Sequence, residues 1–308
     1  MEVIRTKAHG KKLDALLKNK NLPKADKKRV ERTIEAYNAW IAAMKAAKGK
    51  PRSVLASHVK ALNNYKKHVD LELIFDSESD FLYRQKGQLK LDNTILEEFL
   101  PYLFDDRLLP GLKRIKNLSA GPHASFAGLS FASPFVALHV GGANIKLKNQ
   151  DFSVTKSHRM TITDEPGNGS PSFNEKFSVS HFAAEIKTNL DKTMFQEASA
   201  TAAELKKAVP GSKYILLCEY LDMTPITTKL TSIDEVIVLR KAKRLTSNTR
   251  AEFATTAGRK ASRAEYETFL DKHPLDIKCF ERFVWHLEEC FPEKEADAED
   301  IVLGRGYF

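Results

Sequence analysis

Residues 182–189 of the 308-residue chain read FAAEIKTN, and this stretch decides the expected fold and chemistry. Alternate side chains of a strand point to opposite faces, so Glu185 and Lys187 share one face and Ile186 lies on the other. A carboxylate and an ammonium group are costly to bury on an apolar strand unless they have a task. The pair suits phosphodiester hydrolysis: the carboxylate binds a hard divalent cation, and the lysine orients or deprotonates the attacking water. The alternative is an ordinary surface pair, because E-x-K is a short pattern.

A hydrolytic metal site needs a second carboxylate, and two candidates precede this segment. Asp151 opens the strand that begins at Phe152, whereas Asp164 starts the turn DEPGNGS at 164–170. A metal ligand is best held on a rigid element close to the scissile bond. We therefore prefer Asp151, and Asp164 remains the alternative, with turn formation as its simpler role.

Strand and helix patterns alternate around these residues. We predict strands over 152–162, 177–186, 214–218 and 236–239, and helices over 194–208, 261–272 and 275–291. The Gly-, Ser-, Ala- and Pro-rich residues 118–144 are predicted to be a loop with one strand at 134–140, and residues 92–101 a helix start capped by Asn93 or Thr94. This order predicts an α/β fold with a small mixed central sheet flanked by helices.

The N-terminal part of the chain differs in charge from the rest. Residues 11–69 have the apolar spacing of two or three amphipathic helices, interrupted by GKP at 49–51. Residues 1–68 carry a formal charge of +13 and the remainder −4, which gives +9 in total. We therefore divide the chain into a helical basic N-terminal region, 1–70, and a domain over 71–308. A segregated basic surface fits nucleic acid, although a solvated helical face is the simpler alternative.

Composition excludes several other classes of protein. An apolar fraction of 42% argues against general disorder, and no apolar run reaches the 18 residues of a membrane span. The first residues, MEVIR, lack the apolar core of a signal peptide. The three cysteines have no C-x-x-C spacing, which argues against a disulfide framework or a zinc site. We expect a cytoplasmic protein.

Four longer stretches resemble a small family of type II restriction endonucleases in the PD-(D/E)xK nuclease superfamily. They are DFLYRQKGQLK at 80–90, EEFLP at 97–101, EIKTNLDKTMFQEA at 185–198 and LDMTP at 221–225. The family is similar to BbvCI and related cutters of short, nonpalindromic CCTNAGC-type sites. The resemblance spans about residues 60–290. It implies a PD-(D/E)xK core in which Asp151 and Glu185 hold Mg²⁺, with Mn²⁺ as a possible substitute, and Lys187 is the catalytic lysine. Gln150 stands where the superfamily has a proline.

Other polar residues are expected to support this site. A helical carboxylate often joins such sites, so Glu98 is a candidate metal ligand and Glu97 a supporting residue, although both also suit the first turn of a helix. Gln196 is expected to steady Lys187 or a phosphate, unless it is an ordinary surface glutamine.

Two basic clusters are expected to bind DNA, because Arg and Lys suit phosphates and guanine edges and Gln suits adenine. A solvated basic surface is the alternative for each. The candidates are Arg84, Gln85, Lys86, Gln88 and Lys90 in the first cluster, and Arg240, Lys243 and Arg244 in the second.

The resemblance implies a Mg²⁺-dependent, type II site-specific deoxyribonuclease that cuts double-stranded DNA and leaves 5′-phosphate ends. One such site cuts one strand, so we expect a homodimer or a heterodimer with a related subunit. A cognate methyltransferase and a prokaryotic cytoplasm are further expectations. The alternatives are a DNA-binding subunit without turnover and a non-specific repair nuclease of the same fold.

Overall fold

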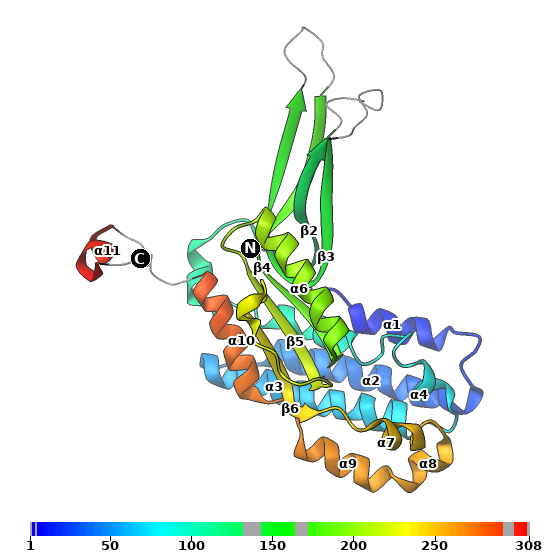
Figure 1. Ribbon diagram of the computed structural model, residues 1–308. Coiled ribbons are helices and arrows are strands. Elements are labelled where there is room, and N and C mark those ends of the chain that lie inside the picture. Colours follow the sequence, from blue (N-terminus) through cyan, green and yellow to red (C-terminus); the bar gives the residue numbers. More distant parts are fainter. Residues whose placement is uncertain (1, 4, 132–142, 164–171, 292–298, 307–308) are drawn as a thin grey trace.

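The computed structural model describes residues 2–3, 5–131, 143–163, 172–291 and 299–306 (Figure 1). Three helices form the N-terminal region, and the break predicted at residues 49–51 separates the second from the third. The helices are α1 (Ala8–Leu17), α2 (Lys24–Ala46) and α3 (Pro51–Lys67). Their apolar faces meet in one core, while Lys24, Lys27 and Lys28 are exposed on α2. The expectation of basic N-terminal helices is therefore confirmed.

The third helix does not stop at the predicted boundary between the two parts of the chain. It continues without a break into the π-helix η1 (His68–Phe75), so residue 70 lies inside a helical element. Buried residues from both sides of this point, such as Val59 and Phe152, belong to one apolar core. The division at residue 70 stays a prediction that rests on charge.

Short helical elements connect this region to the sheet. They are α4 (Phe81–Gln85), α5 (Thr94–Phe99), and the 3-10 turns η2 (Leu100–Tyr102) and η3 (Pro110–Arg114). The helix predicted after Asp92 is confirmed, but its predicted side-chain cap is wrong. Asn93 already has helical torsion angles, and the Thr94 hydroxyl donates to the Lys90 carbonyl at 2.7 Å. The chain thus enters α5 from a turn, in which neither side chain can accept from the first N–H groups.

A mixed sheet of six strands runs through the described part of the chain, in the order β1-β2-β3-β4-β5-β6. The pairs β2–β3 and β3–β4 are antiparallel, and the pairs β1–β2, β4–β5 and β5–β6 are parallel. The strands are β1 (Glu2–Val3), β2 (Leu118–Phe131), β3 (Ala143–Thr163), β4 (Ser172–Leu190), β5 (Lys213–Leu221) and β6 (Glu235–Lys243). The α/β class with a mixed sheet is confirmed.

The strand β2 corrects one prediction, since residues 118–131 were expected to be loop. Their small residues carry little strand propensity, but long-range pairing with β3 from Leu118 to Phe131 satisfies the backbone. The predicted strand 134–140 and turn 164–170, which includes Asp164, lie outside the described residues.

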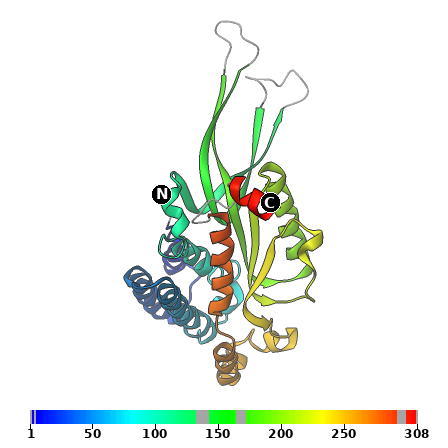
Figure 2. The same ribbon diagram turned by 90° about the vertical axis from the view of Figure 1, so that its left-hand side faces the viewer.

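Helices cover both faces of the inner part of the sheet, because alternate residues of its strands present apolar side chains to each face. The helix α6 (Lys192–Ala208) packs Phe195, Ala198 and Leu205 on the face that presents Ala183 and Leu216. The opposite face presents Ala184, Ile186 and Leu217 to α10 (Ile277–Cys290) and the N-terminal helices (Figure 2).

The remaining helices and the outer part of the sheet complete the fold. The helices α7 (Ser247–Glu252), α8 (Thr256–Ala261) and α9 (Arg263–Lys272) follow β6, and α11 (Glu299–Arg305) is near the C-terminus. The outer parts of β2, β3 and β4 extend away from the helices as an arm (Figure 1). Among the described residues, no helix is long and apolar enough to cross a membrane.

Candidate active site

Two antiparallel neighbours bring the first carboxylate to the E-x-K segment. The register pairs Phe152 on β3 with Ala184 on β4, so the next residues outward, Asp151 and Glu185, are adjacent. The Ile186 backbone N–H donates to Asp151 Oδ2 at 2.8 Å. The preferred residue, Asp151, therefore lies beside Glu185 and is oriented by the backbone of the same strand.

Glu185 is the centre of the site and has a partner on each oxygen. The Lys187 Nζ is 2.7 Å from Glu185 Oε1, and the Tyr214 hydroxyl on β5 donates to Oε2 at 2.5 Å. Glu185 and Lys187 are both half-buried. The structure thus brings together Asp151, Glu185 and Lys187, and adds Tyr214.

The charge states of these groups follow from partial burial and close approach. Burial, and then the negative charge of Glu185, raise the pKa of Asp151, against the opposing hydrogen bond from Ile186. Burial alone would lower the pKa of Lys187, but the hydrogen bond and charge of Glu185 outweigh it, so this pKa is raised. Lys187 is therefore an ammonium group at neutral pH, and the carboxylate pair favours a nearby cation.

These residues lie in an open pocket of about 580 Å³, the active-site pocket. One side is made of β3 and β4, and α6 contributes Met194 and Thr201. The opposite side comes from α4 and the residues that follow it. Besides Asp151, Glu185 and Lys187, the pocket is lined by the cationic residues Arg84, Lys86, Lys90, Lys148 and Arg244. Such a basic rim around a carboxylate pair fits a polyanionic substrate.

The two helical carboxylates have different positions. Burial and then the charge of Asp151 raise the pKa of Glu97, which shows that Glu97 lies within electrostatic reach of the site. Glu98 is buried and faces α1 instead: its Oε2 accepts from the backbone N–H groups of His9 at 2.9 Å and Gly10 at 3.3 Å, and its Oε1 accepts from Tyr37.

The expectation that Glu98 is a metal ligand is therefore wrong. Its Oε2 accepts from N–H groups in the first turn of α1, which have no acceptor within the helix, and its Oε1 accepts from Tyr37 on α2. The amphipathic pattern of α5 explains the error, because adjacent helical residues point about 100° apart and only one of the pair can face the sheet edge.

The residues of the two predicted basic clusters also differ in position: some line the active-site pocket and others do not. Arg84, Lys86, Lys90 and Arg244 line the active-site pocket. Gln85, Gln88 and Lys243 are not among the residues that line it, and Gln88 and Lys243 are exposed. Lys86 is held 4.4 Å from the centre of the Tyr83 ring, and burial lowers its pKa.

Arg240 corrects the second cluster, because the structure places it in the core. Only 4% of it is exposed, and its guanidinium group donates to Glu219 at 2.9 Å and to Asp70 at 3.0 Å. A guanidinium group with these buried partners is not free to bind DNA. On a strand, Arg240 and Lys241 point to opposite faces, and the charge of the segment alone could not say which face was buried.

Gln196 is exposed on α6 and does not line the active-site pocket. The next residue of the same helix, Glu197, is also exposed, and its negative charge helps to raise the pKa of Lys187. Sequence reasoning missed Glu197 and Tyr214. The α6 spacing of Met194, Glu197 and Thr201 was a usable signal, but nothing near Tyr214 indicated that its hydroxyl crosses to β4.

The donor set of this site fits a hard divalent cation. Asp151 and Glu185 supply carboxylate oxygens, and their mutual repulsion favours a bound positive charge. No group of three His, Cys, Asp or Glu side chains that could hold a metal occurs in the described residues. Mg²⁺ commonly uses one or two carboxylates and completes its shell with water and substrate oxygens, so two carboxylates suffice.

Comparison with known proteins assigns the class and then the family. The chain belongs to the class of restriction endonucleases, in agreement with the fold and with a basic pocket around a carboxylate pair. Within this class, the model of the Bpu10I restriction endonuclease matches residues 88–308, and the chain is a member of that family. The resemblance to BbvCI-like type II enzymes is confirmed.

A solved structure supports the fold. The chain is similar to one described as the native BbvCI A2B2 tetramer, with 19% identity and a TM-score of 0.51. The match covers 86% of this chain and 98% of that one. A search of the curated proteins finds no match.

Proposed function

We propose that this restriction endonuclease hydrolyses phosphodiester bonds of double-stranded DNA at a specific sequence, with Mg²⁺ held by Asp151 and Glu185. The observation that carries the proposal is the meeting of these carboxylates with Lys187 on two neighbouring strands, inside a basic pocket. Bound Mg²⁺ would activate water and stabilise the charge that develops on the phosphate. Mn²⁺ has similar ligand preferences and is expected to substitute.

The protein groups have separate roles in this proposal. Asp151 is fixed by the Ile186 N–H, and Glu185 by Tyr214, so both carboxylates are oriented before substrate binds. Lys187 carries a proton, because Glu185 raises its pKa, and therefore donates to the attacking water or to a phosphate oxygen rather than acting as a base. Attack on phosphorus with loss of the 3′-oxygen leaves a 5′-phosphate and a 3′-hydroxyl.

We also propose a second subunit, because one site cuts one strand. The structural neighbour is described as an A2B2 tetramer, which supports an assembly of two related chains. A homodimer serves a symmetric site, and a heterodimer an asymmetric one. A cognate methyltransferase would protect the host DNA, and the system would work in a prokaryotic cytoplasm.

A plasmid assay tests the proposal. The purified chain is incubated with supercoiled plasmid and Mg²⁺, Mn²⁺ or EDTA, beside Lys187→Ala and the control Lys207→Ala, which removes an exposed lysine from α6. We expect discrete bands with either metal, none with EDTA, and loss only in Lys187→Ala. Nicked circles cut at one position would indicate half of a heterodimer.

Two results would contradict the proposal. A smear would favour a non-specific nuclease, and salt-sensitive DNA binding without cleavage, even with a related subunit added, would favour a binding protein. Cleavage by Lys187→Ala at the rate of the unmodified chain would remove Lys187 from the mechanism.

A further inference from the structure

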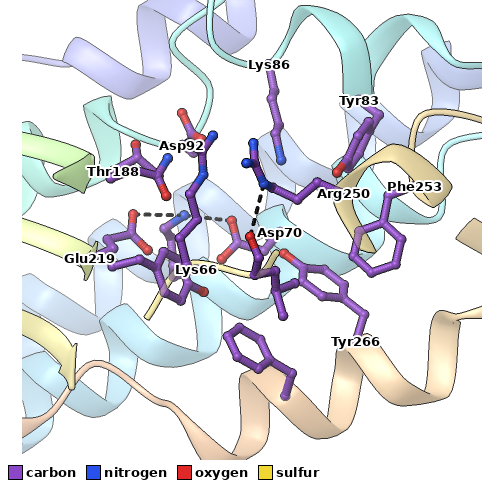
Figure 3. A pocket seen from close by; sticks show the side chains of 15 residues that line it. Lys66, Asp70, Tyr83, Lys86, Asp92, Thr188, Glu219, Arg250, Phe253 and Tyr266 are labelled. Carbon is purple, nitrogen blue, oxygen red and sulfur yellow. Dashed lines mark hydrogen bonds and ion pairs between the residues drawn. The ribbon is translucent and has the colours of Figure 1, made fainter. Parts of the chain in front are cut away.

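A second cavity, of about 260 Å³, adjoins the active-site pocket, and we call it the aromatic pocket (Figure 3). The two pockets share six lining residues, so one opens next to the other. The shared residues are Tyr83, Lys86, Asp92, Thr188, Asn189 and Arg244. The aromatic pocket lies within a few residues of Glu185 and Lys187 along β4, yet none of the proposed catalytic groups lines it.

One wall of this cavity consists of aromatic rings. Figure 3 shows Tyr83, Phe253 and Tyr266 together on one side. Phe75 packs behind them, with its ring centre 4.3 Å from that of Tyr266 and 4.8 Å from that of Phe253. Phe253 is buried in the same cluster. This packing holds the rings in place, so the wall offers a rigid apolar surface on which a planar group can stack.

The other side of the cavity is charged but internally neutralised. Lys66 lies 2.6 Å from Asp70 and 3.2 Å from Glu219, and Arg240 bonds both carboxylates. All four side chains are buried. The charges of these four groups therefore cancel. Arg250 adds a further cation to the lining of the cavity, where its Nε donates to the Leu245 carbonyl at 3.1 Å.

Hydrogen-bonding groups and cations meet where the two pockets join. Within the described residues, no partner donates to or accepts from the side chains of Thr188 and Asn189, which are both half-buried. An amide and a hydroxyl of this kind can read the edge of a heterocycle. Lys86 and Arg244 lie at the same junction, where they would meet backbone phosphates.

We propose that the aromatic pocket binds a single nucleobase that has left the DNA stack next to the cleaved bond. The proposal rests on DNA as the substrate. The cavity is smaller than the roughly 300–1,000 Å³ typical of sites for drug-sized ligands, so it fits one ring system and excludes a duplex. The rings of Tyr266 and Phe253 are inclined by 60°, so a base stacked on Tyr266 would meet Phe253 at its edge. With Asn189 at its hydrogen-bonding edge and the phosphates of its nucleotide at Lys86 and Arg244, such a base matches the three parts of the site.

Filling the cavity tests the proposal. Leu245 lines the aromatic pocket but not the active-site pocket, so Leu245→Trp places an indole in the cavity and leaves the catalytic residues intact. The control is Leu230→Trp, at a position that is 90% exposed. Cleavage and binding are measured on the mapped recognition site, and then on duplexes in which each nucleotide of the site and its neighbours is made abasic in turn.

We expect Leu245→Trp to lose about tenfold or more in binding and cleavage of the intact site. An abasic nucleotide at one position should restore most of this loss, because no base then needs the cavity. A loss without rescue at any position, activity equal to that of the control, or a change in subunit assembly alone would overturn the proposal. Absence of cleavage by the unmodified enzyme would instead contradict the proposed function.

Discussion

The two adjoining pockets are built in opposite ways. The proposed catalytic groups of the active-site pocket, Asp151, Glu185 and Lys187, come from two neighbouring strands, and one strand alone carries Glu185 and Lys187. The aromatic pocket is assembled from α3, η1, α4, β4, β5 and the segment after β6, over more than 200 residues of sequence. A short sequence pattern can therefore indicate the catalytic residues. A pocket whose residues come from distant segments can be recognised only once the fold is known. The first three of the following changes each act on one pocket and should spare the other, and the fourth acts where the two pockets join.

The largest effect is expected from Asp151→Asn. The amide still accepts from the Ile186 N–H but is a poor ligand for Mg²⁺, so the single-turnover cleavage rate should fall by about a thousandfold or more, while the fold is kept. Quench-flow or gel kinetics on a single-site duplex measures this rate. Asp106→Asn, at an exposed position, serves as the control. Normal cleavage by this variant would show that another residue is the first carboxylate ligand, and Asp164 would be the first candidate to test.

The next largest effect is expected on the stability of the protein, from a change in the charged side of the aromatic pocket. Arg240→Ala leaves Glu219 and Asp70 without their guanidinium partner in the core, which should lower the free energy of unfolding by about 3–5 kcal/mol. Urea unfolding followed by circular dichroism gives this value. Lys243→Ala, three residues later and exposed, should change it by no more than about 0.5 kcal/mol. Equal effects of the two variants would contradict the assignment of Arg240 to the core.

A smaller effect is expected from Tyr214→Phe, which removes the hydrogen bond to Glu185 Oε2. A hydrogen bond to a charged group is worth about 1.5 kcal/mol or more, so the cleavage rate should fall by roughly tenfold. The Mg²⁺ concentration for half-maximal rate should rise as well, because Glu185 is oriented less firmly. An unchanged rate and metal dependence would show that Tyr214 only fills space.

The smallest effect is expected at the junction of the pockets. Arg244→Ala removes a half-buried guanidinium that is paired with Asp222 at 2.7 Å. If Arg244 contacts one phosphate, the slope of log affinity against log salt should decrease in magnitude by about one, with sequence preference retained. Titrations at several salt concentrations, with Lys243→Ala as the matched surface variant, would measure it. An unchanged slope would remove Arg244 from the DNA interface.

The sequence predicted the parts of the fold that depend on local pattern. Period-two and period-three-to-four spacing located β3 to β6, α6, α10 and the N-terminal helices, and the strand pattern placed Glu185 and Lys187 on one face. It failed at β2, where pairing with β3 outweighs low strand propensity. It also failed at Glu98 and Arg240, whose charges are satisfied by partners more than 20 residues away.

These failures share a physical reason. A charged residue has the same sequence appearance whether it faces water, substrate or a buried counter-charge, because the partner decides its role. The aromatic pocket could not be predicted from the sequence for a similar reason. Lys66, Tyr83 and Tyr266 each belong to an ordinary helical pattern, and only the fold brings them together.

The continuous helix from α3 into η1 has a consequence for the motions of the enzyme. This single rod carries Lys66 and Asp70 of the charged side and Phe75, which supports the aromatic wall. A movement of this rod would therefore displace the charged side of the pocket together with the residue that supports its aromatic wall. In hydrogen-exchange terms, the amides from α3 to η1 form one cooperative unit, which should exchange slowly and together, near the rate of global unfolding.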